Sequence, residues 1–214
     1  MRYGVGSGKV LILLALLSIL GLAVAAEFTD LGCGGFASNG TAAIATLRNL
    51  ASCEIQFRAA AKVDVDGDGR GEYGTFGEMT GAVGLRTDAA GRTRGEVLRP
   101  AILSPALANV SAEGIVTKSG YCFRIFLPAR GGSAHEGKRG EAFSAPVDVD
   151  AAEDRWCAYA WPVKRDSGPH RAFTVGPSGD VLQSANDRTR YAGPEAGPAF
   201  DAAARDGEDW KPTN

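Results

Sequence analysis

The sequence lacks the residue patterns that usually identify an enzyme. It has only two histidines, His135 and His170, and both lie in glycine- or proline-rich surroundings. It contains no HExxH helix and no nucleophile elbow, and the glycine-rich run at residues 4–9 does not have the spacing of a phosphate-binding loop. We therefore expect no catalysis and assign no catalytic or cofactor-binding residue.

An excess of positive charge and a zinc-type cysteine spacing are missing as well. The 23 Lys and Arg residues are balanced by 25 Asp and Glu residues, which gives a net charge of −2. A chain without a basic field is a poor candidate for binding nucleic acid. No CxxC pair occurs, so we expect no zinc site.

The longest uncharged stretch is a hydrophobic run over residues 10–26, preceded by Arg2 and Lys9. Its length is close to the lower limit for a membrane-spanning helix. A basic start, an apolar middle and small residues at 23–26 also describe a secretory signal peptide. We assign residues 1–26 as a signal peptide or membrane anchor. The remainder would then be periplasmic or at the cell surface, tethered to the inner membrane through residues 10–26 if they are not cleaved.

Four cysteines follow this segment, and an even number in an exported chain favours disulfides. We prefer Cys122 with Cys157, because both lie in strand-like runs that would be neighbours. Cys33 would then pair with Cys53. The alternative is a set of small buried side chains with free thiols.

The periodicity predicts an α+β fold with one amphipathic helix packed on a small antiparallel sheet. Apolar residues recur at three- and four-residue steps over 41–62, after a glycine-rich linker at 27–40. Strand-like runs follow at 120–127, 156–161, 171–175 and 180–183, and the last two flank a Gly-Pro-Ser-Gly turn. A helix followed by consecutive short strands packs across one face of the sheet. The predicted domain spans 41–190, and we expect an irregular tail at 191–214.

One loop has a spacing that implies chemistry. Residues 64–69 read Asp-Val-Asp-Gly-Asp-Gly, with oxygen-bearing side chains at alternate positions and a glycine at the sixth. This pattern wraps a short chain around calcium. The expected ligands are Asp64, Asp66, Asp68, the backbone carbonyl of Arg70, and Glu72. Thr75 occupies the twelfth position, where the helix–loop–helix calcium motif has a bidentate glutamate, and a solvated acidic turn is the alternative.

Two further clusters have open interpretations. The carboxylates of Asp148, Asp150, Glu153 and Asp154 would hold a second cation or form an exposed acidic stretch. The aromatic residues between 156 and 161 would form a ligand surface or divide between the core and the surface of a strand.

The helix sequence AAIATLRNLASCEIQFRAA followed by DVDGDGRGEYGTFGEM resembles type IV pilin-like proteins and type II secretion pseudopilins. The resemblance implies an N-terminal apolar helix, an amphipathic continuation and a small sheet. It also implies self-association or contact with secretion-system components. The chain departs from the prepilin cleavage motif, because Lys9 follows Gly8 and Leu13 stands where a glutamate is usual.

We therefore expect an exported or membrane-anchored pilin-like protein with a calcium-stabilised loop and no catalysis. A monomeric cell-envelope binding module is the first alternative, with its ligand surface near residues 156–161. An exported hydrolase is the second, with His135 or His170 beside carboxylates in a cleft.

Overall fold

The computed structural model of the protein describes residues 38–138, 141–165, 170–205 and 209–213. The predicted signal or anchor at 1–26, most of the linker and Cys33 lie outside these ranges. Within the described part of the chain, no helix combines the length and the apolar character that crossing a bilayer requires.

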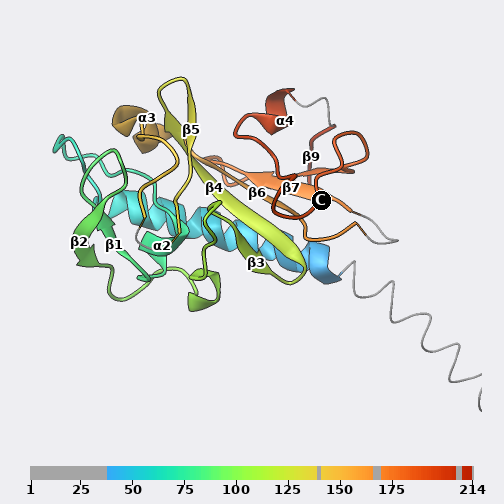
Figure 1. The fold of residues 1–214 in the computed structure, drawn as a ribbon, viewed down its shortest axis with the longest axis horizontal. Coiled ribbons are helices and arrows are strands. Elements are labelled where there is room, and N and C mark those ends of the chain that lie inside the picture. Colours follow the sequence, from blue (N-terminus) through green and yellow to red (C-terminus); the bar gives the residue numbers. More distant parts are fainter. Residues whose placement is uncertain (1–37, 139–140, 166–169, 206–208, 214) are drawn as a thin grey trace, which may run out of the picture. The chain divides into compact units, whose positions relative to one another are not determined.

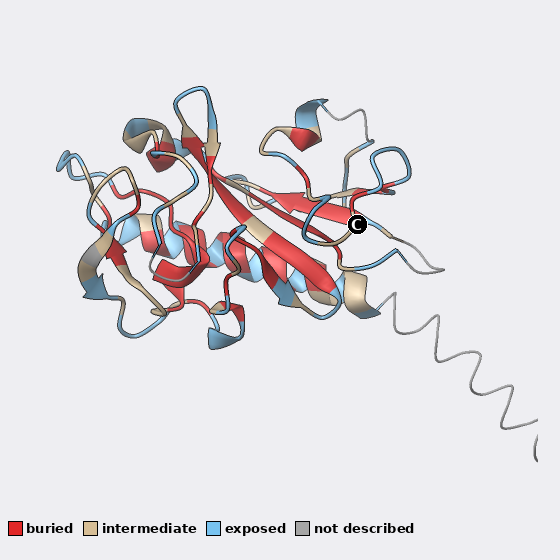
Figure 2. Ribbon diagram, in the orientation of Figure 1, coloured by how far each residue is buried: buried red, intermediate tan, exposed pale blue. Residues whose placement is uncertain are grey.

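The predicted amphipathic helix is present as α1, over residues 38–59. It begins three residues earlier than expected, inside the predicted linker, and ends three residues earlier. The side chains at its three- and four-residue steps are buried, including Leu47, Leu50 and Phe57. Its outer face is exposed, and Ile55 there retains 54% of its accessible surface (Figure 2). The apolar periodicity therefore identifies both the helix and the face that it buries.

A seven-stranded antiparallel sheet forms the second layer (Figure 1). Its strand order is β3-β4-β6-β7-β8-β9, and β5 pairs with β4 beside this path. The hairpin predicted at the Gly-Pro-Ser-Gly turn is confirmed, because β7 pairs with β8 across it. The strands are β3 (Val116–Lys118), β4 (Tyr121–Ala129), β5 (Gly132–Ala134), β6 (Cys157–Pro162), β7 (Ala172–Val175), β8 (Leu182–Ser184) and β9 (Lys211–Pro212).

Helix α1 covers one face of this sheet. Alternate residues of the central strands, among them Phe123, Ala160 and Phe173, share one apolar cluster with Leu47 and Leu50 of α1. The three strand residues lie opposite one another in the register of β4, β6 and β7. The predicted packing of a helix on an antiparallel sheet is therefore confirmed.

The C-terminal segment covers the opposite face. The side chains that β4 and β6 send to that face, Phe126, Tyr159 and Trp161 among them, pack with Tyr191 and Phe200. The segment also contains helix α4 (Ala202–Arg205) and strand β9. The predicted irregular tail from residue 191 thus contains two short elements and packs on the sheet. Its aromatic residues are separated by glycine and proline and show no periodicity, although they bury one side of the sheet.

Smaller elements fill the space beside these layers. Strands β1 (Gly84–Arg86) and β2 (Thr93–Val97) form a separate two-stranded sheet. The short helices are α2 (Phe76–Met79), the 3₁₀ turn η1 (Pro105–Leu107) and α3 (Val149–Asp154). Helices α2 and α3 position the charged groups discussed below.

The preferred disulfide does not form. Strands β4 and β6 are neighbours, as expected, but the register places Cys122 opposite Trp161 and Cys157 opposite Phe126. The two cysteines are thus offset by four residues, or about 13 Å at ~3.3 Å per residue. A disulfide requires Cα atoms within about 7 Å. Cys53, Cys122 and Cys157 carry free thiols.

Truncation of the buried face of α1 tests this packing. Leu50→Ala removes a side chain with no accessible surface, so we expect it to lower the free energy of unfolding by about 2–5 kcal/mol. Ile55→Ala, on the exposed face of the same helix, should change it by less than about 0.5 kcal/mol. Urea unfolding followed by circular dichroism measures both. Equal effects would mean that α1 is not packed on the sheet through Leu50.

Candidate cation site and buried carboxylate cluster

The acidic loop is shaped by its own backbone. The carboxylate of Asp64 accepts hydrogen bonds from the amides of Gly67 at 2.8 Å, Asp68 at 3.1 Å and Gly69 at 3.0 Å. The two glycines adopt positive φ angles of 76° and 90°, which other residues rarely adopt. The loop therefore folds tightly around Asp64, and most of that carboxylate's acceptor capacity serves the backbone.

Asp66 and Asp68 keep oxygen atoms available. Asp66 uses Oδ1 to accept from the Asp68 amide at 3.3 Å, and Asp68 uses Oδ1 to accept from the Arg70 amide at 2.7 Å. One oxygen from each of Asp64, Asp66 and Asp68 lies within 4.8 Å of the others. Burial and the nearby charges of Asp68 and Asp64 raise the pKa of Asp66 above its usual value. This loop thus concentrates negative charge that a cation would relieve.

Helix α3 brings further carboxylates to this loop. One oxygen from each of Asp66, Asp150 and Glu153 lies within 4.8 Å of the other two. The side chain of Asp148 caps the helix by accepting from the Ala151 amide at 3.2 Å. The acidic loop and the acidic stretch at 148–154 therefore meet at Asp66. The spacing of 150 and 153, one turn apart on a helix, was the only signal of their common face.

Arg70 already neutralises part of this cluster. Its guanidinium forms an ion pair with Glu153 and a second one with Asp154 at 3.1 Å, and Arg58 pairs with the same Asp154 at 3.1 Å. Burial raises the pKa of Glu153, and Arg70 opposes that rise. The side chain of Arg70, rather than its carbonyl, is thus the part with a defined role in this structure.

Glu72 does not join the loop carboxylates. Its side chain is only 1% exposed and points to the interior, where Oε1 accepts from the Val65 amide at 2.7 Å. Its Oε2 pairs with Arg86 Nη2 at 2.9 Å. The side chain expected as the ligand at position nine is therefore held in the interior by a buried guanidinium.

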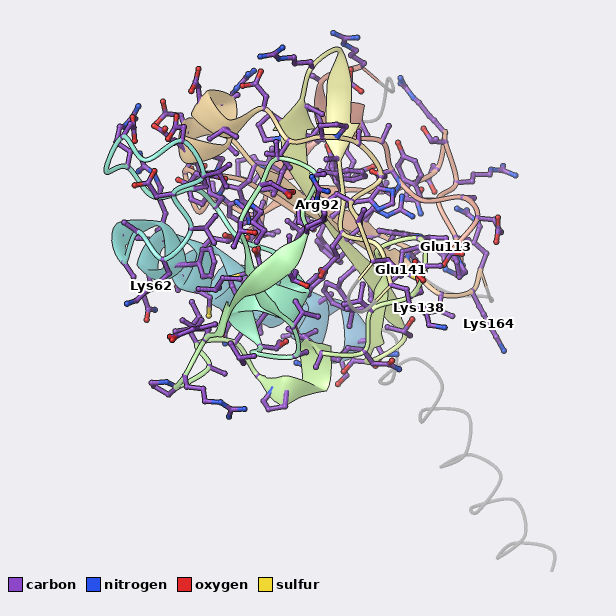
Figure 3. The ribbon with its side chains drawn as sticks, turned by 60° about the vertical axis from the view of Figure 1, so that its left-hand side comes forward. Lys62, Arg92, Glu113, Lys138, Glu141 and Lys164 are labelled. Carbon is purple, nitrogen blue, oxygen red and sulfur yellow. The ribbon has the colours of Figure 1, made fainter. Side chains whose placement is uncertain are left out.

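Arg86 lies at the centre of a buried charge cluster. Besides Glu72, its Nη1 pairs with Glu78 at 2.6 Å, and its Nη2 donates to the Tyr73 carbonyl at 2.7 Å. Both ion-pair partners have no more than 1% of their side chains exposed. By contrast, the side chains of Lys62 and Lys164 project into solvent (Figure 3). Strand β1 thus places a positive charge in the interior, where only carboxylates neutralise it.

Four successive backbone amides donate to this region's carboxylates. The amide of Gly74 donates to Glu54 at 2.8 Å, that of Thr75 to Glu78 at 3.1 Å, and those of 76 and 77 to Glu136 at 2.9 and 3.0 Å. Thr75 also forms a capping box with Glu78 at the start of α2. All residues from 71 to 80 are buried. Glu54 and Glu136 from two other segments, together with Glu78 of the same stretch, therefore accept the hydrogen bonds of this buried backbone.

The other predicted sites are not assembled in the described residues. Trp156, Tyr159 and Trp161 are no more than 3% exposed, so the expected alternative of an aromatic ligand surface there is wrong. The His135 ring contacts the Glu136 carbonyl at 3.1 Å, and burial lowers its pKa. The backbone carbonyl of His170 accepts a hydrogen bond from the side-chain amide of Asn186.

Comparisons of the chain with models of known protein families, with curated proteins and with solved structures find no match. The resemblance to pilin-like proteins is therefore carried by the residues of this sequence alone.

Loss of the buried guanidinium should be costly. Arg86→Met leaves Glu72 and Glu78 buried without a cationic partner, so we expect the free energy of unfolding at pH 7 to fall by about 3–5 kcal/mol. Arg92→Met breaks an exposed pair with Asp88 and should cost less than about 1 kcal/mol. Arg92 lies at the surface just before β2 (Figure 3). Urea unfolding of both variants in the same buffer makes the comparison, and similar costs would contradict a central role for Arg86.

Proposed function

We propose that this chain is a non-catalytic, exported or membrane-anchored protein of the pilin-like type, whose soluble domain binds calcium at the loop of residues 64–70. The main support for a calcium site is the position of Asp66, which belongs to two groups of three closely spaced carboxylates. One group comes from the loop and the other includes helix α3. A cation there would join two segments that are far apart in the sequence.

The donor set fits a hard cation. It consists of carboxylate oxygens from Asp64, Asp66 and Asp68, with Asp150 and Glu153 in place of Glu72. The backbone carbonyl of Arg70 completes the proposed set. Calcium takes six to eight oxygen ligands in a flexible arrangement, which suits an exposed loop opposite a short helix. Binding would require Glu153 to exchange its ion pair with Arg70 for the cation.

The structural role rests on the arrangement of α1. A long N-proximal helix laid along an antiparallel sheet is the architecture that the resemblance to pilin-like proteins implies. In this proposal the N-terminal apolar segment supports anchoring in the membrane, self-association or contact with secretion-system components. The cation would stiffen the region where the chain leaves α1 and enters the loop.

Both alternatives have less support. A binding module with an aromatic surface at 156–161 does not agree with the burial of those rings. A hydrolase needs a histidine ring beside a carboxylate. Nδ1 of the His135 ring lies 3.1 Å from a backbone carbonyl, that of Glu136.

Calcium should stabilise the protein through Asp66. A ligand that binds only the native state at 100 times its dissociation constant adds about 2.7 kcal/mol. For a domain of this size that corresponds to roughly 5–10 °C in melting temperature. We expect this increment in thermal unfolding of the full chain in a constant mild detergent, with calcium against excess chelator. Asp66→Asn should abolish it, and Asp180→Asn, an exposed carboxylate elsewhere, should not. An unchanged increment in Asp66→Asn would refute the site.

A variant at Glu72 distinguishes the ligand set expected from the sequence, which includes Glu72, from the set proposed here, which does not. Glu72→Gln weakens the pairing with Arg86, so we expect it to lower the free energy of unfolding by about 1–3 kcal/mol. The calcium increment of this variant should equal that of the unmodified chain, because its side chain faces the interior. Loss of the increment with little change in stability would return Glu72 to the ligand set.

A further inference from the structure

We infer that the carboxylate cluster, defined as Glu54, Glu72, Glu78 and Glu136 around Arg86, holds protons on Glu54 and Glu136 at neutral pH. In this state the cluster stabilises the buried segment 71–80 of the folded protein. This stabilisation is present in acidic and neutral solution and decreases as the pH rises. This inference is independent of the proposed calcium site, because neither proton-bearing residue touches a proposed ligand.

The first argument is the balance of buried charge. The cluster contains four carboxylates and one guanidinium, and all five side chains are buried. The guanidinium is already paired, through separate nitrogen atoms, with Glu72 and Glu78. Two more ionised carboxylates would leave three uncompensated negative charges in the interior. A buried group usually neutralises instead, because charge without water or a partner is costly.

Hydrogen bonds distinguish two of the four carboxyls from the others. Glu72 accepts from the Val65 amide and from Arg86. Glu78 accepts from the backbone and guanidinium of Arg86 and from Thr75. Both therefore accept charge-assisted bonds, as an ionised carboxylate does.

Glu54 has much weaker support as a charged group. It comes from α1, and its Oε2 accepts one bond, from the Gly74 amide. Its Oε1 is buried and has no hydrogen-bond partner among the described residues. Burial raises the pKa of Glu54 well above its usual value, and the Gly74 amide and Arg86 offset this only in part. The neutral form is therefore the less costly one.

Glu136 has a proton that can leave within the ordinary pH range. Burial raises its pKa to about 8, and the charge of Glu78 adds to the rise, whereas the amides of Phe76 and Gly77 oppose it. The approach is tight, because a Cβ on Gly77 would lie 2.9 Å from Oε2 of Glu136. Ionisation of Glu136 thus places a new charge beside Glu78 in a buried, closely packed position.

The titratable and charged groups near the carboxyls of Glu54 and Glu136 come from several elements that pack together. Helix α1 supplies Glu54 itself and Cys53, the loop supplies Glu72, α2 supplies Glu78, and β1 supplies Arg86. These groups surround the four amides of residues 74–77. Repulsion within the cluster would therefore act directly on the hydrogen bonds that hold segment 71–80.

The direction in which stability changes with pH follows from the raised pKa values of Glu54 and Glu136. In the unfolded chain both glutamates lose their protons near pH 4.3. Between that pH and the folded-state values, the folded protein binds more protons than the unfolded chain, so its stability falls as the pH rises. Each such proton raises the unfolding constant tenfold per pH unit. For Glu136 this window closes at about pH 8.

The test is urea unfolding of the full chain between pH 5 and 9, with chelator present and the same detergent throughout. We expect the unfolding constant of the unmodified protein to rise by more than tenfold from pH 6 to pH 8. Glu54→Gln and Glu136→Gln keep an amide acceptor oxygen but cannot ionise, so each should reduce this slope by one proton. Glu96→Gln, an exposed glutamate on β2, should leave it unchanged. Slopes that are equal in all four proteins would overturn the inference.

A second measurement does not depend on the folding of any variant. Unfolding of the unmodified chain in weakly buffered solution at pH 7 should release about two protons from these glutamates, which a pH indicator records. Net proton uptake, or no exchange, would equally overturn the inference.

Discussion

The ion pairs of Arg86 with Glu72 and Glu78 are the constraint on which the surroundings of α2 depend. A guanidinium with no exposed surface cannot be left without partners. Glu72 reaches it from the end of the acidic loop and Glu78 from α2, so the path of the chain between them is fixed. The remaining acceptors, Glu54 and Glu136, are drawn to the same place by the amides of residues 74–77. A polar centre therefore organises this end of an otherwise apolar core.

The sheet is organised by a different rule. Its strands bury side chains on both faces, so that Phe123 and Phe126, which point to opposite faces of β4, belong to separate apolar clusters. One cluster is closed by α1 and the other by the C-terminal segment. Trp161 Nε1 donates to the Gly193 carbonyl at 2.6 Å, and the Tyr159 hydroxyl donates to the Phe200 carbonyl at 3.2 Å. These hydrogen bonds attach the C-terminal segment, which has little secondary structure of its own, to the sheet.

Local patterns predicted the elements of this fold, and long-range contacts decided the rest. Helix α1 and strands β4, β6, β7 and β8 were predictable because their periodicity or turn chemistry is contained in a few residues. The register that separates Cys122 from Cys157 depends on pairing across the sheet, which no local pattern encodes. The same limit applies to the buried glutamates, since glutamate is almost always exposed unless it is paired. Asp64, Asp66 and Asp68 were predicted as one group, whereas Asp150 joins them only through the packing of α3.

Glu72 connects the acidic loop with the buried ion pairs of Arg86. Counted from Asp64, it stands at a ligand position, yet its Oε1 holds the Val65 amide at 2.7 Å and its Oε2 holds Arg86. The base of the loop is therefore fixed from the interior. Together with the backbone bonds to Asp64, this contact shapes the loop with protein groups alone. The cation proposed at Asp66 would then bind a loop whose base is held by Glu72.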